Sequence, residues 1–265
     1  MAFRLHILTT DSSAFSLLDI LAEKIEASCI IIPSNRENSA KVIAVKKEAI
    51  QRGIPISVHQ KQKPFDAKLP VADLAVSWMY SQIIKPEDIS RYKFGAINMH
   101  GGKIPEYRGA NVLQWAIING EITLNVAWHL IVREVDAGDI ISEGEIPIAA
   151  ESTAWEVRCL MLEKGISLFP EALQNCISGH KIRKPVLSDG KVWPSRSPED
   201  GRIELNLPER KVRDLIRALC PPWPRAFITI NEENIPIASL SLKPSDKTIP
   251  YRTAEGVLIH LRRAI

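Results

Sequence analysis

The sequence predicts an α/β fold: a Rossmann-like, mostly parallel sheet with helices on both faces, followed by a small C-terminal α+β subdomain. Short apolar runs alternate with amphipathic segments through residue 182, as strands and helices do in parallel sheets. Residues 183–202 are rich in Pro, Ser, Gly and charge, which indicates a linker. We therefore expect a main domain over 1–182, a linker over 183–202 and a small domain over 203–265.

The N-terminal part repeats a strand followed by a helix. Apolar, often β-branched runs predict strands, and they cover 3–8, 28–32, 54–58, 73–79 and 95–100. Apolar residues at helical spacing predict the helices between them, and they cover 14–27, 40–53 and 85–92. Gly53 is expected to end the second of these helices.

The remainder of the chain is predicted in the same way. After residue 100 we expect a turn, a helical segment and a second apolar strand, then an edge strand over 140–148 and a long helix over 153–178. The C-terminal part should contain a helix over 207–219, stopped by Pro221 and Pro222. Short strands are expected at 227–230, 237–242 and 256–261.

Composition narrows the class of protein. The 265 residues are enough for one or two domains, and 45% apolar with 25% charged residues is typical of a soluble globular chain. The net charge of +3 is spread along the chain. It is compatible with an anionic small substrate, and no basic cluster indicates nucleic-acid binding. The short N-terminal apolar run does not fit a signal peptide, and no apolar run reaches the roughly 18 residues of a membrane span. We expect a cytoplasmic protein with no membrane partner.

Neither the cysteines nor the spacing of other candidate ligands indicates a disulfide or a metal site. Cys29, Cys159, Cys176 and Cys220 lie far apart with no CxxC spacing, so we interpret them as free thiols. No cluster of ligating residues has the spacing of a metal site, so no metal is expected. The first strand-to-helix turn has no glycine, which argues against a phosphate loop and against a dinucleotide-dependent oxidoreductase.

Three polar residues at predicted strand ends form the candidate site. Asn98 and His100 are two residues apart on an extended tip, so their side chains point to the same side. Asp136 follows the next apolar strand, and strand ends are where open α/β sheets bind ligands. Acyl transfer to an amine needs an oxyanion donor, a proton relay and a carboxylate that holds the relay, which Asn, His and Asp supply in that order. The alternative is a hydrogen-bonded, purely structural histidine.

At these residues the sequence resembles a known family. Asn98-Met99-His100, the segment KIPEYRGANVLQWAIINGE and the later VDAGDI occur in the order seen in formyltransferases that use 10-formyltetrahydrofolate. That family includes methionyl-tRNA formyltransferase, the glycinamide ribonucleotide enzyme and sugar-nucleotide N-formyltransferases. The resemblance implies that Asn98, His100 and Asp136 are catalytic, that 10-formyltetrahydrofolate is the formyl donor, and that the C-terminal subdomain is a truncated version of the family's barrel.

The resemblance also implies binding residues. The folate is expected against a loop after the fourth strand and against a second wall, at Tyr80, Ser81, Gln82, Ile83, Ile84, Val135 and Asp139. The acceptor is expected against the segment after the candidate catalytic histidine, at Gly101, Gly102, Lys103, Tyr107 and Arg108. Ordinary core packing of Ile83 and Ile84, and a solvated Arg108, are the alternatives. His129 matches a histidine of many relatives and is equally compatible with a structural role.

The sequence favours a small acceptor. A short, neutral turn at 33–39 stands where tRNA-modifying relatives carry a long basic insertion, and phosphate contacts by Lys and Arg dominate tRNA affinity. The Gly pair after His100 and the retained C-terminal subdomain favour an amino sugar on a nucleotide carrier. Methionyl-tRNA, another small amine and a non-catalytic folate-binding role stay open, as does a homodimer.

Overall fold

The structure is a computed structural model that describes residues 3–21, 24–241 and 243–264. The chain forms two compact units, each made of three segments. The first unit comprises Met1–His100, Val126–Gly144 and Leu162–Gly190, and the second comprises Gly101–Asn125, Glu145–Met161 and Lys191–Ile265. The domain boundaries predicted at residues 182 and 202 stay a prediction.

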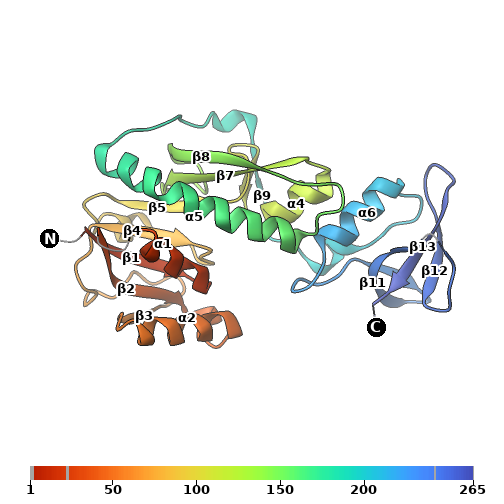
Figure 1. The fold of residues 1–265 in the computed structure, drawn as a ribbon, viewed down its shortest axis with the longest axis horizontal. Helices are drawn as coiled ribbons and strands as arrows, with labels where there is room; N and C mark the ends of the chain where they lie inside the picture. Colours follow the sequence, from red (N-terminus) through yellow and green to blue (C-terminus); the bar gives the residue numbers. More distant parts are fainter. Residues whose placement is uncertain (1–2, 22–23, 242, 265) are drawn as a thin grey trace. The chain divides into compact units, whose positions relative to one another are not determined.

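A seven-stranded sheet in the order β3-β2-β1-β4-β5-β7-β8 forms the centre of the fold (Figure 1). Its strands are β1 Phe3–Thr9, β2 Ile25–Pro33, β3 Ile56–His59, β4 Leu74–Trp78, β5 Ala96–His100, β7 Thr123–Leu130 and β8 Ile140–Pro147. The pairs from β3 to β5 are parallel, and β7 runs antiparallel to β5. The mostly parallel sheet is therefore confirmed, and so is the edge position of β8.

Continuous apolar runs form the inner strands because both faces of the sheet are covered. Leu5, Ile7 and Leu8 of β1 are fully buried, as are Ile30 and Ile32 of β2. Side chains on both faces of these strands are buried, so apolar and polar residues do not alternate along them. This burial explains why a run such as Cys29–Ile32 is recognised as a strand from sequence.

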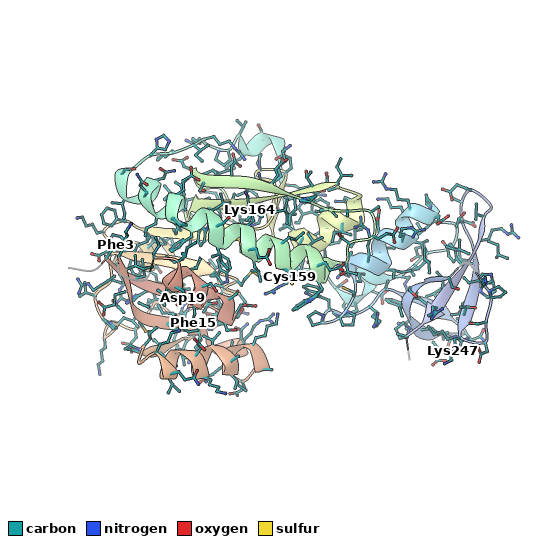
Figure 2. All side chains as sticks on the ribbon, in the orientation of Figure 1. Phe3, Phe15, Asp19, Cys159, Lys164 and Lys247 are labelled. Carbon is teal, nitrogen blue, oxygen red and sulfur yellow. The ribbon has the colours of Figure 1, made fainter. Side chains whose placement is uncertain are left out.

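The first helix is shorter than predicted. A 3-10 turn, η1 Ser12–Ala14, leads into α1 Phe15–Asp19, and β2 already begins at Ile25. The predicted helix over 14–27 was wrong after α1, and its residues 22–23 lie outside the described residues. Pairing of β2 with β1, which sets Ile25 opposite Phe3, outweighs the helical spacing of this segment. Figure 2 labels Phe15 and Asp19, the two α1 residues that Arg52 contacts by a cation–π interaction and a 2.5 Å ion pair.

The other helices lie at their predicted positions, but the one predicted over 85–92 is only half as long. α2 Ala40–Gln51 is capped by Ser39, whose side chain accepts from the Val42 N–H, and the chain leaves it through Gly53 with φ +67°. α3 is the short Pro86–Ile89, and α5 is the long Ala154–Ser178.

α5 packs closely on the sheet at a glycine. A Cβ at Gly165 would lie 3.1 Å from both Met99 and the Trp78 ring. The Gly165 carbonyl accepts a 2.9 Å hydrogen bond from Trp128 Nε1, and Trp128 stacks on Trp78 at 5.8 Å. These buried contacts hold the strands that carry the candidate site.

The second unit contains a four-stranded antiparallel sheet in the order β10-β11-β13-β12 and a two-stranded ladder, β6-β9. Its elements are β6 Tyr107–Gly109, α4 Val112–Asn119, β9 Lys191–Trp193, η4 Pro198–Gly201, α6 Glu209–Ala218, β10 Phe227–Ile230, β11 Glu233–Ser241, β12 Thr248–Arg252 and β13 Leu258–Arg263. The short 3-10 helix η3 Leu187–Asp189 belongs to the first unit. The predicted strand 237–242 is part of β11, with residue 242 outside the described residues. Sequence reasoning missed β6, β9 and β12.

The segment predicted as a linker contains β9, which pairs in parallel with β6. Three-residue strands are too short to show a period, and their pairing joins residues about eighty positions apart. The Trp193 ring stacks on Tyr107 at 5.3 Å with an interplanar angle of 4°. This stacking supports a strand whose own sequence carries no signal.

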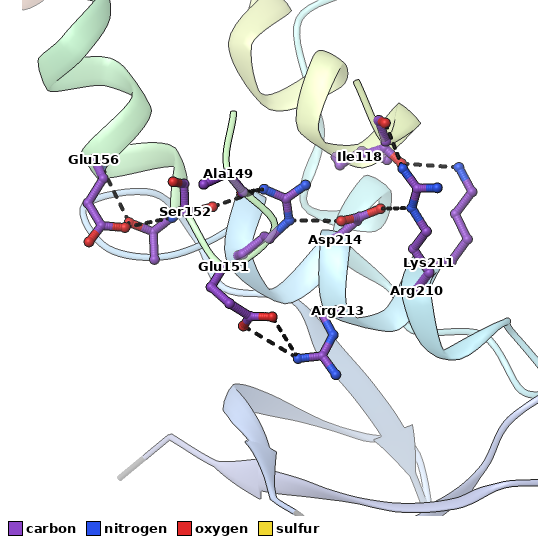
Figure 3. A network of polar contacts seen from close by, with 12 residues as sticks. Ile118, Ala149, Glu151, Ser152, Glu156, Arg210, Lys211, Arg213 and Asp214 are labelled. Atoms are coloured by element: carbon purple, nitrogen blue, oxygen red, sulfur yellow. Dashed lines mark hydrogen bonds and ion pairs between the residues drawn. The ribbon is translucent and has the colours of Figure 1, made fainter. Parts of the chain in front are cut away.

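Polar contacts attach α6 to its neighbours in the second unit (Figure 3). Arg210 and Lys211 donate to the carbonyls of Gly120 and Ile118 at the C-terminal end of α4, where cations are favoured. The buried Arg217 donates to Asp214 at 2.8 Å and to the carbonyl of Ser152 at 3.0 Å. Breaking such a buried pair by removing one partner is costly, so this network fixes α6.

Candidate functional site

The candidate site begins where β5 pairs with β7 in the first unit. Asn98 of β5 stands directly opposite His129 of β7, and His100 stands opposite Ala127. Asn98 and His100 share a face because side chains alternate along a strand. Asn98 Nδ2 lies 3.1 Å from His129 Nε2, so the two opposite residues are in hydrogen-bond contact.

Asp136 reaches both histidines. Its Oδ2 lies 3.4 Å from His100 Nδ1, and its Oδ1 lies 3.4 Å from His129 Nε2. Asp136 has φ +46°, a left-handed conformation that Asp tolerates better than most residues. The structure therefore brings Asn98, His100 and Asp136 into one cluster, with the carboxylate between two imidazoles.

His129 adopts a definite protonation pattern. Its Nδ1 lies 2.9 Å from the Leu130 carbonyl oxygen, which can only accept, so Nδ1 carries the proton. In the neutral ring Nε2 then accepts from the amide nitrogen of Asn98. A protonated ring would instead direct an Nε2–H toward Asp136. In this neutral form His129 orients the Asn98 amide with its nitrogen toward Nε2, which suits Asn98 to act as a donor.

The turn that carries Asp136 is locked against β7. The Leu130 N–H donates to the Asp139 carbonyl at 2.9 Å. A Cβ on Gly138 would lie 1.8 Å from the Leu130 carbonyl oxygen, the same oxygen that receives the His129 proton. Glycine is therefore required at 138 by close backbone approach, and this position was missed in the sequence.

The residues after β4 that are predicted to bind folate differ in burial and in hydrogen bonding. The Tyr80 hydroxyl lies 2.7 Å from His59 Nδ1, and Gln82 Nε2 donates to Asn35 at 3.1 Å. Ser81 and Ile83 are exposed, and Ile83 is 77% exposed. Ile84 is buried in an apolar cluster with Phe65, which favours a packing role for it.

The residues of the second predicted wall are partly accessible. Val135 is 42% exposed, and Asp139 pairs with Lys181. Both belong to the turn that carries Asp136. The second wall is therefore an extension of the same turn, with an apolar and an acidic side chain.

The predicted acceptor residues lie in the second unit. Gly101 packs against Met161, whose Sδ would lie 2.1 Å from an added Cβ, and Gly102 is buried. Lys103 is exposed and pairs with Glu106 at 2.9 Å, a hydrogen bond that raises the pKa of Lys103. Arg108 is buried, with 8% exposure, so it is not a solvated surface arginine.

Tyr107 is held rather than exposed. Its hydroxyl donates to Glu121 at 2.8 Å and accepts from Asn119 Nδ2 at 3.1 Å. Burial raises the pKa of Tyr107 to about 12, with Glu121 adding to the effect, so the phenol stays neutral at physiological pH. Tyr107 therefore supports the segment that carries Lys103 and Arg108.

Two classes of feature are absent from the described residues. Among residues 3–21, 24–241 and 243–264, no group of three or more His, Cys, Asp or Glu side chains is arranged to hold a metal ion. No helix in that part of the chain has the length and apolar character needed to cross a membrane.

Comparison with known proteins matches the chain both to family models and to individual relatives. A family model described as formyl transferase matches residues 24–173, and one described as its C-terminal domain matches residues 196–262. Methionyl-tRNA formyltransferase of Thermodesulfovibrio yellowstonii is 31% identical over 77% of this chain and 68% of that protein. The bifunctional polymyxin resistance protein ArnA of Wigglesworthia glossinidia brevipalpis is 29% identical over 72% of this chain but only 30% of its own length.

A solved structure shares the fold over nearly the whole chain. The sugar 3N-formyl transferase WlaRD, crystallised with dTDP and 5-N-formyl-THF, superposes with a TM-score of 0.75 over 99% of this chain and 98% of its own, at 19% identity. At that identity the likeness establishes the fold, including the C-terminal antiparallel sheet.

Gly138→Ala is expected to destabilise the protein by about 1–3 kcal/mol, as overpacking against an immovable group does. The added Cβ meets a backbone oxygen, so the turn itself must move. Gly144→Ala is the matched control, because the close contacts of its Cβ would be with the flexible end of Lys164, which Figure 2 labels on α5. Urea unfolding of both variants measures the difference. Equal losses of stability would contradict a special requirement at Gly138.

Proposed function

The chain belongs to the formyl transferase family of formyl-transferring enzymes, and we propose that it moves a formyl group from 10-formyltetrahydrofolate to the primary amine of an amino sugar carried on a nucleotide. The observation that carries the proposal is the cluster in which the Asp136 carboxylate faces the imidazoles of His100 and His129. Asn98, on the same face of β5, completes a donor, a proton relay and a carboxylate.

The residues around the loop after β4 fit the flat, amide-like edge of a folate pterin. Gln82 Oε1 is buried and has no hydrogen-bond partner among the described residues. Residues 80–84 make no backbone–backbone hydrogen bond within the described part of the chain, which leaves N–H and C=O groups for a ligand edge. Ile83 and Val135 supply exposed apolar surface. We assign Tyr80–Ile84, Val135 and Asp139 to folate binding. When bound, the folate supplies an electrophilic formyl carbon.

Each residue of the cluster then has one role in the reaction. The Asn98 amide, held with its nitrogen inward by His129, donates an N–H to the formyl oxygen as that oxygen gains negative charge. His100 takes the proton that the attacking amine loses, at Nε2, because its Nδ1 faces Asp136. Asp136 holds that Nδ1–H and stabilises the imidazolium that forms, which is the usual service of a buried carboxylate behind a histidine.

The acceptor is supported by a structural likeness and by the segment after His100. WlaRD is a sugar formyl transferase crystallised with dTDP, and this chain shares its fold throughout. Lys103 lies three residues after His100 and is exposed, so we assign it to the diphosphate of the sugar nucleotide. Gly101, Gly102, Tyr107 and Arg108 are assigned to the acceptor side as the frame of that segment.

Methionyl-tRNA is the second candidate acceptor. The observation that favours it is the 31% identity to the Thermodesulfovibrio yellowstonii enzyme over 68% of that protein. A non-catalytic folate-binding role is opposed by the presence of Asn98, His100 and Asp136 in contact geometry.

His100→Asn and Asp136→Asn should each lower the rate of formyl transfer by about 10²–10⁴-fold, because proton handling is lost. Asp136→Asn keeps the side-chain shape, and His100→Asn keeps a polar side chain. Release of tetrahydrofolate in the presence of an amino-sugar nucleotide measures the rate. His180→Asn, an exposed histidine after α5, is the control and should keep full activity. Near-normal turnover of a His100 or Asp136 variant would remove that residue from the mechanism.

Lys103→Ala should raise the KM for the sugar nucleotide by roughly tenfold to a hundredfold, the effect of losing a charge-assisted hydrogen bond. The KM for the folate should stay unchanged. Turnover is measured with several amino-sugar nucleotides and with initiator methionyl-tRNA at two salt concentrations. Efficient, strongly salt-dependent formylation of the tRNA, with no sugar nucleotide accepted, would show that the acceptor is wrong and leave the reaction type intact.

A further inference from the structure

The loop assigned to the folate, residues 80–84, is here called the donor loop. It follows β4 through Met79, whose φ of +52° turns the chain sharply and whose carbonyl accepts a 2.6 Å hydrogen bond from Thr10 Oγ1. Within the described residues the loop itself makes no backbone–backbone hydrogen bond. Its position is therefore set by side chains, and by Tyr80 first of all.

Tyr80 is anchored by a buried histidine that the proposed chemistry does not use. His59, at the end of β3, is 4% exposed. Its Nε2 lies 2.9 Å from the Lys63 carbonyl, which can only accept, so Nε2 carries the proton. Nδ1 is then the acceptor of the Tyr80 hydroxyl at 2.7 Å. Both ring nitrogens are thereby used, and the ring has one orientation.

Packing adds to this anchor. The His59 ring lies nearly parallel to Tyr80, with an interplanar angle of 11°, and meets Phe65 edge-on at 4.7 Å. Burial, with a smaller effect from Asp88, raises the pKa of Tyr80, so its hydroxyl stays a donor throughout the pH range of an assay. Ile84, buried against Phe65, fixes the other end of the loop.

The arrangement divides the donor loop into inward and outward residues. Tyr80 and Ile84 at its two ends point into the protein, while Ser81 and Ile83 between them are exposed. Tyr80 and Ile84 therefore anchor the two ends of the loop, and between them the Gln82 side chain donates to Asn35. The two end anchors differ in kind. Only one of these, the hydroxyl-to-imidazole bond, is directional.

We infer that His59 is a positioning residue for the formyl donor, acting through Tyr80 to hold the backbone of the donor loop in its binding geometry. The inference rests on the proposed function, since it takes the donor to be a folate. It adds a residue outside the loop, on a different strand, to the determinants of donor affinity.

The chain offers a matched pair of variants that isolates this role. Tyr80→Phe removes the hydroxyl that His59 accepts, and Tyr92→Phe removes a like bond to the buried His6 Nδ1, at 2.9 Å. Both tyrosines pack with the same apolar cluster, but Tyr92 lies outside the donor loop. The two variants should lose similar stability in urea unfolding, because each removes one hydrogen bond between a tyrosine hydroxyl and a buried imidazole nitrogen.

Binding of 5-formyltetrahydrofolate, a stable analogue of the donor, is measured by calorimetry on the full chain. Tyr80→Phe should weaken binding by roughly threefold to tenfold, the value of one neutral hydrogen bond. Tyr92→Phe should bind like the wild type. The KM for the acceptor should be unchanged in both variants, because a change confined to the donor loop leaves the acceptor segment untouched.

Variants of His59 itself provide a second test should Tyr80→Phe fail to fold. His59→Asn keeps an acceptor near the Nδ1 position and should retain most of the affinity, whereas His59→Leu should lose it. Equal affinities in all variants, or equal weakening by Tyr80→Phe and Tyr92→Phe, would overturn the inference. Wild-type protein that binds no folate would instead overturn the proposed donor, and the positioning role with it.

Discussion

The candidate site depends on the carboxylate of Asp136, which faces one imidazole nitrogen with each of its oxygens. A carboxylate with little solvent exposure must be compensated by donors. His100 Nδ1 lies 3.4 Å from one carboxylate oxygen and can serve as such a donor. His129 faces the other oxygen, and its charge state decides whether its Nε2 serves Asn98 or Asp136. The tautomer of His100 and, through His129, the orientation of the Asn98 amide are therefore both linked to the Asp136 carboxylate.

The fold makes this coupling possible by reversing one strand. β7 runs antiparallel to β5, so His129 lies directly opposite Asn98, and the turn that follows β7 carries Asp136. In that turn Asp136 adopts a left-handed conformation, and Gly138 admits the Leu130 carbonyl at close range. The same carbonyl orders His129. The turn after β7 therefore determines both the backbone geometry and the side-chain contacts around Asp136.

Sequence alone predicted what is periodic or chemically distinctive. Buried strands appear as apolar runs, and Asn98, His100 and Asp136 stand out as polar residues at strand ends. It did not predict where α1 ends, because the pairing of Ile25 with Phe3 is non-local and the segment has helical spacing. The partnership of His59 with Tyr80 was also hidden, since it joins residues from two strand ends that carry no common motif.

The most direct test of this account is ¹⁵N NMR of the imidazole nitrogens in the wild-type protein and in Asp136→Asn. The account predicts that wild-type His100 is protonated at Nδ1 and not at Nε2, because Asp136 faces Nδ1, and that the variant loses this single tautomer. His129 should keep its Nδ1 proton in both proteins, because the Leu130 carbonyl holds it. A wild-type His100 protonated at Nε2 alone, or one unaffected by the loss of the carboxylate, would contradict the account.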